Sequence, residues 1–502
     1  MFISLKDNQY DNTISWKQAW KEYGNDRKIV AVSSPKYFDG SEYKKILTLF
    51  NGKTLSDLAK PENEKKYGKF LTFPSNAAKS ELDDDKKVLF ELLDAESENP
   101  SFRTGNVMGF FSLRGEKKDN DEVPEEIRMR ITSRFDDAQG KDNFFLHYML
   151  QKVCNIAIAP RTSSGKETFY DFLPYLFPNY LREACKQGIY RAYVRREYND
   201  ANVRGPIDVA RHIRYNTPFN GKVAYHTREY TADNKITQLI RHAIEHISAM
   251  GILIFDGDAR DDKNKIIQAT PTYSKSERSR VIAQNLHPVT HPYYTAYEPL
   301  RVLCLGILQH KKLSYGENSE NNIAGILFDG ASLWEEYLNV LLKEKCERML
   351  VHPNNRTGDD KQRLFVNDES DENRTIYPDF LWDLSDNKYT AEAVLDAKYK
   401  PLDAKGLSRD DAFQMLAYMF RFDSKNGYLL YPQKYNDTND NYSKKYALFR
   451  DKSITIQSIG LKIPEACGEY SIFCENMKNA EKIFLNTVIN GDTKKNIEGI
   501  SG

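Results

Sequence analysis

Two carboxylates and a lysine in the C-terminal half of the chain have residue types and a spacing that suit a metal-dependent phosphodiesterase site. Asp379 ends a Tyr-Pro-Asp run, and Asp396 and Lys398 follow 17 and 19 positions later. Mg²⁺ prefers carboxylate oxygens and retains several waters, so Asp379 and Asp396 are predicted to hold Mg²⁺, with Mn²⁺ as a substitute. The ion would polarise a scissile phosphate and lower the pKa of a bound water. Lys398, a compact and mobile point charge, would orient or deprotonate that water.

A β-hairpin is the element expected to position these three residues. Residues 380–384 are apolar and aromatic, residues 385–388 have turn chemistry, and residues 390–399 form a second strand-like run. Because strand side chains alternate between faces, Asp396 and Lys398 are predicted to share one face. The opposite face takes their neighbours Leu395, Ala397 and Tyr399. Charges at alternate positions of such a strand are costly without partners, and a divalent cation is one such partner.

Three further candidate residues lie on helices that flank the predicted hairpin. Gln414 and Tyr418 are four positions apart, on one face of the helix expected after the hairpin. On the helix expected before the hairpin, Glu335 lies about 90° from the apolar stripe, whereas Glu336 points nearly opposite to it. We predict that Glu335, Gln414 and Tyr418 join the catalytic set. The order helix, hairpin, helix, strand allows these elements to converge on one site.

Each of these assignments has a structural alternative. The two acids and the lysine match a loose pattern and can belong to an ordinary hairpin with solvated side chains. Gln414 can be an incidental residue of a core helix, and Glu335 can form a salt bridge at the boundary of the core. The combination of the features favours a catalytic site.

Apolar periodicity and turn residues predict the other elements of an α/β protein. Polar loops are expected over residues 115–126, 256–265 and 352–374. Strands are expected over residues 107–114, 128–135, 427–431 and 454–463, and residues 128–135 alternate like an edge strand. Helices are expected over residues 144–154, 236–250, 333–350 and 408–422, the last with Ser408 as its cap and Asp411 three positions on.

Length and composition indicate a folded protein of two or three domains. The chain has 502 residues, of which 40% are hydrophobic and 29% charged, with 72 basic and 72 acidic side chains. Zero net charge means that DNA contacts must come from local patches. The six cysteines form no CxxC pair, which argues against a zinc ribbon or a disulfide scaffold. The sequence has no apolar run of about 18 residues and no signal-peptide pattern, so we expect a cytoplasmic protein without a membrane partner.

Other motifs carry less information. Residues 163–168 (SSGKET) lack the first glycine of a phosphate loop, so we expect no nucleotide triphosphate hydrolysis by this chain itself. His242 and His246 lack the glutamate of a metalloprotease helix. A basic and aromatic stretch over residues 189–197 is either a solvated face or a contact surface for nucleic acid or protein. In the second case its contact residues are Arg191, Arg195 and Arg196, and Arg204 in the turn that follows is a further candidate.

Taken together, these motifs make the chain resemble the McrC family, the nuclease subunits of McrBC-type restriction systems, including LlaJI-like members. Residues 189–214 resemble the family's Arg-rich segment that leads into an RGxID motif, and residues 326–338 (ILFDGASLWEEYL) resemble its helix with the pattern lFD…lfEeyv. The runs YPDF, LDAKYK, QMLAY and YLLYP resemble its PD-(D/E)XK core. The resemblance covers about residues 125–465, and the combination of motifs is specific although each motif alone is not.

The resemblance implies a C-terminal restriction-endonuclease-like α/β domain over residues 301–502, in which the two acids and the lysine are catalytic. It implies a partner-contacting region over residues 121–300, and residues 1–120 form an N-terminal region of unknown fold. Together these two regions make up a mixed α+β, strand-rich N-terminal part. The implied partners are double-stranded DNA and an McrB-like AAA+ GTPase hexamer, which translocates DNA and whose GTP hydrolysis the chain stimulates. GTP is therefore expected to act only through the partner.

Two other functions are compatible with the sequence. The chain can be a catalytically inert adaptor and GTPase activator, against which the intact acids and lysine speak. It can also be a stand-alone RecB-like repair nuclease that cleaves with Mg²⁺ alone, as the spacing of Gln414 and Tyr418 suggests. The DNA target and the stoichiometry with the motor cannot be predicted from this sequence.

Overall fold

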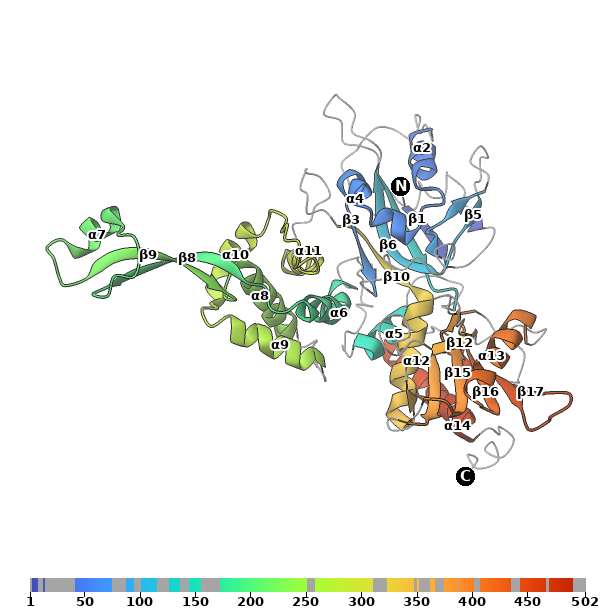
Figure 1. The fold of residues 1–502 in the computed structure, drawn as a ribbon. Coiled ribbons are helices and arrows are strands. Elements are labelled where there is room, and N and C mark those ends of the chain that lie inside the picture. The colour runs from blue at the N-terminus through green and yellow to red at the C-terminus, as the bar shows by residue number, and fades with distance from the viewer. Residues whose placement is uncertain are drawn as a thin grey trace.

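The structure of the chain, a computed structural model, contains an N-terminal sheet region, a helical region that carries a long arm, and a C-terminal sheet region (Figure 1). The arm extends away from the two sheet regions (Figure 1). The described residues are 2–7, 12–13, 41–74, 87–93, 101–114, 126–135, 144–154, 172–250, 258–309, 323–346, 350–351, 362–365, 374–386, 388–400, 407–434, 443–465 and 469–490. Among them, no helix is both long enough and apolar enough to span a membrane.

The N-terminal region is built on a five-stranded sheet with the strand order β1-β7-β6-β10-β3. β1 and β7 are parallel, β10 and β3 are parallel, and β6 runs antiparallel to both of its neighbours. The carboxyl ends of β1, β7, β10 and β3 therefore all lie along the same side of the sheet, the side at which these strands finish. Apolar side chains on one face of the sheet pack against α2 and α3. The elements are β1 (Phe2–Lys6), α2 (Ser41–Phe50), α3 (Leu55–Leu58), α4 (Pro61–Tyr67), β3 (Lys69–Phe73), β6 (Val107–Arg114), β7 (Glu126–Thr132) and β10 (Ile323–Asp329).

The strand predicted over residues 107–114 is confirmed by β6. The strand predicted over residues 128–135 is confirmed by β7, but its expected edge position is wrong, because β7 lies between β1 and β6 and hydrogen-bonds to both. The strands of this sheet come from all three predicted regions. β1, β3 and β6 lie before residue 120, β7 lies between residues 121 and 300, and β10 lies after residue 300. A small sheet of order β2-β5-β4 lies beside it. Its strands are β2 (Asn12–Thr13), β4 (Glu91–Leu92) and β5 (Ser101–Arg103).

The helical region joins the arm to the rest of the molecule. In α8, the side chain of Asn234 accepts the first free backbone N–H groups, and apolar residues at helical spacing are buried against α11. The polar loop expected over residues 256–265 is wrong for residues 258–265, which belong to α9, because one stripe that includes the buried Asp262 and Ile266 packs inward. The helices of this region are α6 (Leu173–Lys186), α8 (Lys235–Ala249), α9 (Asp258–Ala269), η5 (Lys275–Glu277), α10 (Arg278–Gln284) and α11 (Tyr297–Leu308). α5 (Phe144–Cys154) contacts α6 and also packs against α12 in the C-terminal region.

The arm is a long antiparallel hairpin with a short helix at its tip (Figure 1). β8 (Ala192–Asp200) and β9 (Val223–Thr231) pair along their whole lengths, and α7 (Val209–Asn216) lies between them in the chain. Side chains along β8 alternate between exposed and partly buried, and none is fully buried. A two-stranded ribbon alone is only marginally stable, but here α7 packs on β9 near the tip, where Ala224 and Tyr225 are fully buried.

The C-terminal region is built on a six-stranded sheet with the order β11-β14-β15-β16-β18-β17. α12, α14 and α5 pack on one face, and α13 packs on the other. β15, β16 and β18 are parallel, while β14 and β17 are antiparallel to their neighbours. The elements are α12 (Gly330–Cys346), β11 (Leu350–Val351), β14 (Phe380–Leu384), β15 (Ala391–Ala397), α13 (Arg409–Arg421), β16 (Asn426–Lys434), β17 (Ser443–Ala447), β18 (Thr455–Ile463) and α14 (Tyr470–Asn490).

The predicted order of helix, hairpin, helix and strand is confirmed by α12, β14–β15, α13 and β16. The loop expected over residues 352–374 is wrong in part, because β12 (Gln362–Phe365) pairs with β13 (Arg374–Ile376) within it. Gln362 is buried there, and α13 holds β12 through Arg421, whose Nε donates to the Arg363 carbonyl at 2.8 Å. Most of the charged loop at residues 115–126 and the run at 163–168 lie outside the described residues.

Candidate active site

The β14–β15 hairpin brings the two predicted metal ligands together. Phe380 pairs with Leu395, so Asp379 and Asp396 flank a cross-strand pair. Oδ2 of Asp379 accepts the backbone N–H of Ala397 at 2.7 Å, which holds its carboxylate over the end of β15. Asp396 is buried, whereas Asp379 remains partly accessible to solvent. The hairpin therefore places both carboxylates at one end of the sheet.

Lys398 lies directly after β15 and reaches back to Asp396. Its Nζ lies 2.6 Å from Oδ2 of Asp396 and donates to Oε1 of Gln414 at 2.7 Å. Its backbone N–H donates to the Leu430 carbonyl at 2.9 Å, so β16 continues to hold the chain at this point. The ammonium group is thus held between one carboxylate and one amide.

α13 supplies a hydrogen-bonded chain that ends at the hairpin. Ser408 caps the helix by accepting the backbone N–H of Asp411, as the sequence predicts. Nε2 of Gln414 donates to the hydroxyl of Tyr418 at 2.8 Å, and that hydroxyl donates to the Tyr377 carbonyl at 3.3 Å. A series of hydrogen bonds therefore connects Lys398, through Gln414 and Tyr418, to the segment before Asp379, although these residues come from three elements.

α12 directs its two adjacent glutamates to different neighbours. The negative charge of Glu335 acts on Asp379, which places Glu335 beside the predicted metal ligands. Burial raises the pKa of the Cys154 thiol, and Glu336 adds to that rise, so Glu336 faces α5 instead. Trp334 fixes the helix against the sheet, since its indole N–H donates to the Leu430 carbonyl at 3.2 Å.

The site concentrates negative charge that calls for a cation. Burial raises the pKa of the Asp379 carboxyl well above its ordinary value, and Glu335 and Asp396 raise it further. Burial also raises the pKa of Asp396, against the lowering effect of Lys398. Burial alone would lower the pKa of Lys398, but the charges of Asp396 and Asp411 raise it above its ordinary value. Lys398 alone does not neutralise the carboxylates.

These residues fit Mg²⁺ better than an ion that needs a full protein cage. Among the described residues, no three His, Cys, Asp or Glu side chains are arranged to hold a metal together. Mg²⁺ usually takes one or two carboxylates and keeps several waters, which two aspartates can satisfy. Oδ2 of the buried Asp396 lies 2.6 Å from Nζ of Lys398, and because a carboxylate oxygen has two lone pairs, it retains capacity for a further partner.

Sequence reasoning assigned Asp411 only to the helix cap and missed its place in the site. Its buried carboxylate accepts hydrogen bonds from Lys400 at 2.5 Å and from the hydroxyl of Ser408 at 2.6 Å. It also lies 3.9 Å from Nζ of Lys398. The signal was present in the spacing, because residues 411, 414 and 418 share one helical face.

The four predicted contact arginines lie on the arm and not near the carboxylates. Arg191 precedes β8, Arg195 and Arg196 lie in it, and Arg204 lies in the turn before α7. Arg196 pairs with the buried Asp233 at 3.2 Å and has a structural role at the base of the arm. Arg204 is exposed, donates to the Tyr225 hydroxyl at 3.1 Å and stacks over Tyr198.

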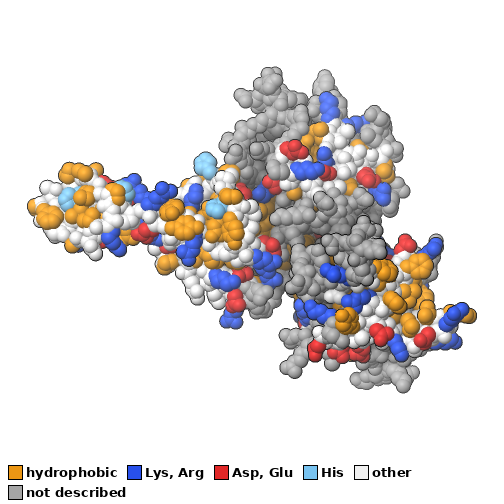
Figure 2. Space-filling model, viewed as in Figure 1, with side chains coloured by type: hydrophobic (Ala, Val, Ile, Leu, Met, Phe, Trp, Pro, Cys, Tyr) orange, Lys and Arg blue, Asp and Glu red, His pale blue; other side chains and the backbone are white. Residues whose placement is uncertain are grey.

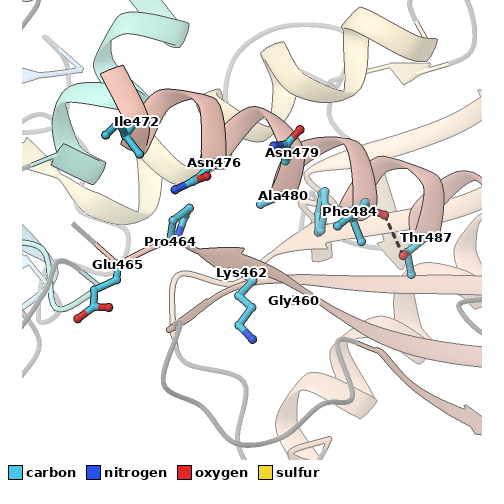
Figure 3. A pocket seen from close by; sticks show the side chains of 11 residues that line it. Gly460, Lys462, Pro464, Glu465, Ile472, Asn476, Asn479, Ala480, Phe484 and Thr487 are labelled. Carbon is cyan, nitrogen blue, oxygen red and sulfur yellow. Dashed lines mark hydrogen bonds between the residues drawn. The ribbon is translucent and has the colours of Figure 1, made fainter. Parts of the chain in front are cut away.

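A cavity of about 440 Å³ lies between the end of β18 and α14 (Figure 3). Its lining is mostly apolar and amide side chains, including Ile472, Asn476 and Phe484, together with the charged Lys462 and Glu465. None of the predicted catalytic residues lines it. This cavity therefore offers no alternative to the carboxylate site.

Residues 102–432 of the chain match one known protein family. The family model described as McrBC 5-methylcytosine restriction system component matches residues 102–432. A chain in the refined half-complex from the tetradecameric assembly of Thermococcus gammatolerans McrB AAA+ hexamers with bound McrC is 14% identical, with a TM-score of 0.45, and the match covers 95% of this chain and 100% of that chain. A chain in the cryo-EM structure of the Thermococcus gammatolerans McrBC complex is 14% identical, with a TM-score of 0.28, and the match covers 68% of this chain and 87% of that chain. No curated protein matches.

Proposed function

Because the chain belongs to the McrBC 5-methylcytosine restriction system component family, we propose that it is the Mg²⁺-dependent DNA endonuclease subunit of such a system. One observation carries this proposal: Asp379, Asp396 and Lys398 meet at one end of the C-terminal sheet, with Nζ of Lys398 2.6 Å from Asp396. We assign the C-terminal region to the restriction-endonuclease-like, PD-(D/E)XK class on the same basis. A cytoplasmic location would follow from this function.

The proposed chemistry is hydrolysis of a phosphodiester bond. Asp379 and Asp396 would hold Mg²⁺, which when bound polarises the scissile phosphate and acidifies a water. Lys398 would orient the attacking water and offset charge on the phosphate, and its contacts to Asp396 and Gln414 set the position of its ammonium group. Tyr418 holds Gln414 in place, and Glu335 adds negative charge that strengthens cation binding.

We propose that the arm contacts an McrB-like AAA+ GTPase hexamer. Its tip exposes large apolar side chains, and Lys and Arg side chains lie along the hairpin next to it (Figure 2). Phe219 is 70% exposed and Ile213 59% exposed. Apolar side chains grouped at a protruding tip mark an interaction site, and an AAA+ motor would be its occupant. Arg191, Arg195 and Arg204 would then contact the partner.

The decisive experiment reconstitutes the chain with its motor subunit, DNA, GTP and Mg²⁺. We expect DNA cleavage that EDTA abolishes and that Asp396→Ala and Lys398→Ala eliminate, while both variants still stimulate the GTPase of the motor. Undiminished cleavage by Asp396→Ala would show that another subunit cuts the DNA and that this chain is an adaptor. Cleavage by the wild-type chain with Mg²⁺ alone would identify a stand-alone repair nuclease.

A further inference from the structure

The N-terminal sheet meets the candidate catalytic strand at a buried polar joint. Asp7 follows β1 directly, and Ser133, Arg134 and Phe135 follow β7. Because β1 and β7 are parallel, these residues lie together at one edge of the sheet. The residue that docks against this edge is Tyr399, the immediate neighbour of Lys398.

Three residues that follow β7 hold Tyr399. The guanidinium of Arg134 donates to the backbone carbonyl of Tyr399 and lies 4.8 Å from the centre of its ring. The hydroxyls of Ser133 and Tyr399 are 3.2 Å apart. Phe135 packs edge-on against the tyrosine ring, with the ring centres 5.4 Å apart. All four residues are buried.

Two more residues complete the joint: Asp7 holds Arg134, and Gly330 packs against Tyr399. Oδ1 of Asp7 accepts the backbone N–H of Arg134 at 2.6 Å, and Asp7 is fully buried. Gly330, the first residue of α12, leaves room for the tyrosine ring: a Cβ there would lie 2.6 Å from Cε1 of Tyr399. Its backbone N–H donates to the Asn106 carbonyl at 2.8 Å, so α12 starts from the N-terminal sheet.

Buried charged side chains such as these lower the stability of the fold unless their contacts compensate, so their presence here indicates that they hold a particular arrangement of the chain. Taking an arginine and an aspartate out of water costs several kcal/mol per ion before their attraction is counted. Apolar side chains would fill the same space at lower cost. The contacts here grip the backbone carbonyl of Tyr399, one residue beyond Lys398. They therefore restrain the main chain from which the catalytic ammonium extends.

We propose that Arg134 and Tyr399 are positioning residues, through which the N-terminal sheet holds Lys398 in its place. The inference rests on the proposed nuclease function for its catalytic consequence. It assigns to the N-terminal sheet a part in the nuclease site besides any contact with the motor. Lys398 is held by Asp396 and Gln414 at its side chain and by this joint at its backbone.

The test compares Arg134→Gln with Arg103→Gln, which removes an exposed arginine 3.2 Å from Glu91 elsewhere in the N-terminal region. In the full chain without metal, we expect amide hydrogen exchange over residues 396–400 to be at least about 5-fold faster in Arg134→Gln, as for local opening. In the reconstituted complex, kcat for cleavage should fall about 10- to 100-fold, since small misplacements cost this much. The KM for DNA and the GTPase stimulation should match those of Arg103→Gln.

Gly330→Ala is a second variant that disturbs the same joint without removing a polar group. It provides the test if Arg134→Gln does not fold. Its Cβ would displace the ring of Tyr399, so the same two effects are expected. Unchanged exchange and kcat in either folded variant would overturn the inference. So would a loss of thermal stability that leaves kcat and exchange at residues 396–400 unchanged. If the wild-type complex cleaves no DNA, the proposed function fails, while the exchange measurement still decides whether the joint restrains this segment.

Discussion

Lys398→Met should destabilise the protein through the charge that it leaves behind on Asp396. The Nζ–Oδ2 distance is 2.6 Å and Asp396 is buried, so the attraction is about 6 kcal/mol at an effective dielectric constant near 20. Removing one partner of a buried pair usually costs about 3–5 kcal/mol. Asp396 can escape part of this penalty by binding a proton. We therefore expect a loss of about 2–3 kcal/mol in the free energy of unfolding at pH 8.

The pH dependence of this loss has a definite sign. Burial already raises the pKa of Asp396 above its ordinary value of 3.8, and removal of Lys398 raises it further. The unfolded variant releases this proton near pH 4 while the folded variant retains it to higher pH, so the variant loses stability as pH rises. The difference from wild type should be largest at pH 8 and should vanish near pH 4. Urea denaturation in EDTA at a series of pH values measures it.

Two controls make the reasoning refutable. The double variant Asp396→Asn/Lys398→Met removes both charges, so its stability should lie within about 1 kcal/mol of wild type at pH 8. Lys186→Met removes an exposed ion pair with Glu183, 2.7 Å long, and should cost about 0–1 kcal/mol at any pH. A Lys398→Met protein as stable as wild type at pH 8 would refute the argument. A loss that grows on acidification would refute it as well.

Three other expectations follow from the same geometry. Asp411→Asn should lower the free energy of unfolding by about 1–2 kcal/mol at neutral pH. Burial acts to raise the pKa of Asp411, but hydrogen bonds from Lys400 and Ser408 lower it below 3.8. The difference in stability, measured by urea titration, should therefore disappear as pH falls below that value. Mg²⁺ at about 100 times its dissociation constant should stabilise wild type by about 2.7 kcal/mol in thermal unfolding, and Asp396→Asn should show no such shift. Phe219→Asp should weaken binding of the motor about 10-fold or more in a pull-down titration, without the loss of thermal stability that core changes cause, whereas Tyr389→Asp, which is 63% exposed on the C-terminal region, should bind normally.

Local patterns in the sequence predicted the elements around the site well. Helix α5 (Phe144–Cys154) and strand β6 (Val107–Arg114) have the expected bounds, because a largely apolar run and the polar residues beside it are local signals. The start of α13 was predictable for the same reason, since a serine cap acts within its own turn. The hairpin followed from turn residues between two apolar runs.

Contacts between segments far apart in the chain were not predictable in this way. α9 looked like a loop because most of its residues are charged or polar, and only packing of a narrow stripe that contains Ile266 makes it a helix. Asp411 looked like a cap residue, and its proximity to Lys398 depends on how α13 crosses the sheet. The edge prediction for β7 failed because β1, more than 100 residues earlier, supplies the missing partner.

The alternation of side chains along β15 shows what sequence periodicity can predict and what it cannot. The pattern assigned Asp396 and Lys398 to one face and Leu395, Ala397 and Tyr399 to the other. In the structure, Leu395 packs against α12 and α14, and Tyr399 enters the joint with Arg134. One face of the strand is therefore held by helices of the C-terminal region and by the N-terminal sheet, while the face that carries the buried Asp396 is turned toward α13. A period of two residues identifies such faces, but only the fold decides what each one meets, and here the second face connects the N-terminal sheet to the lysine.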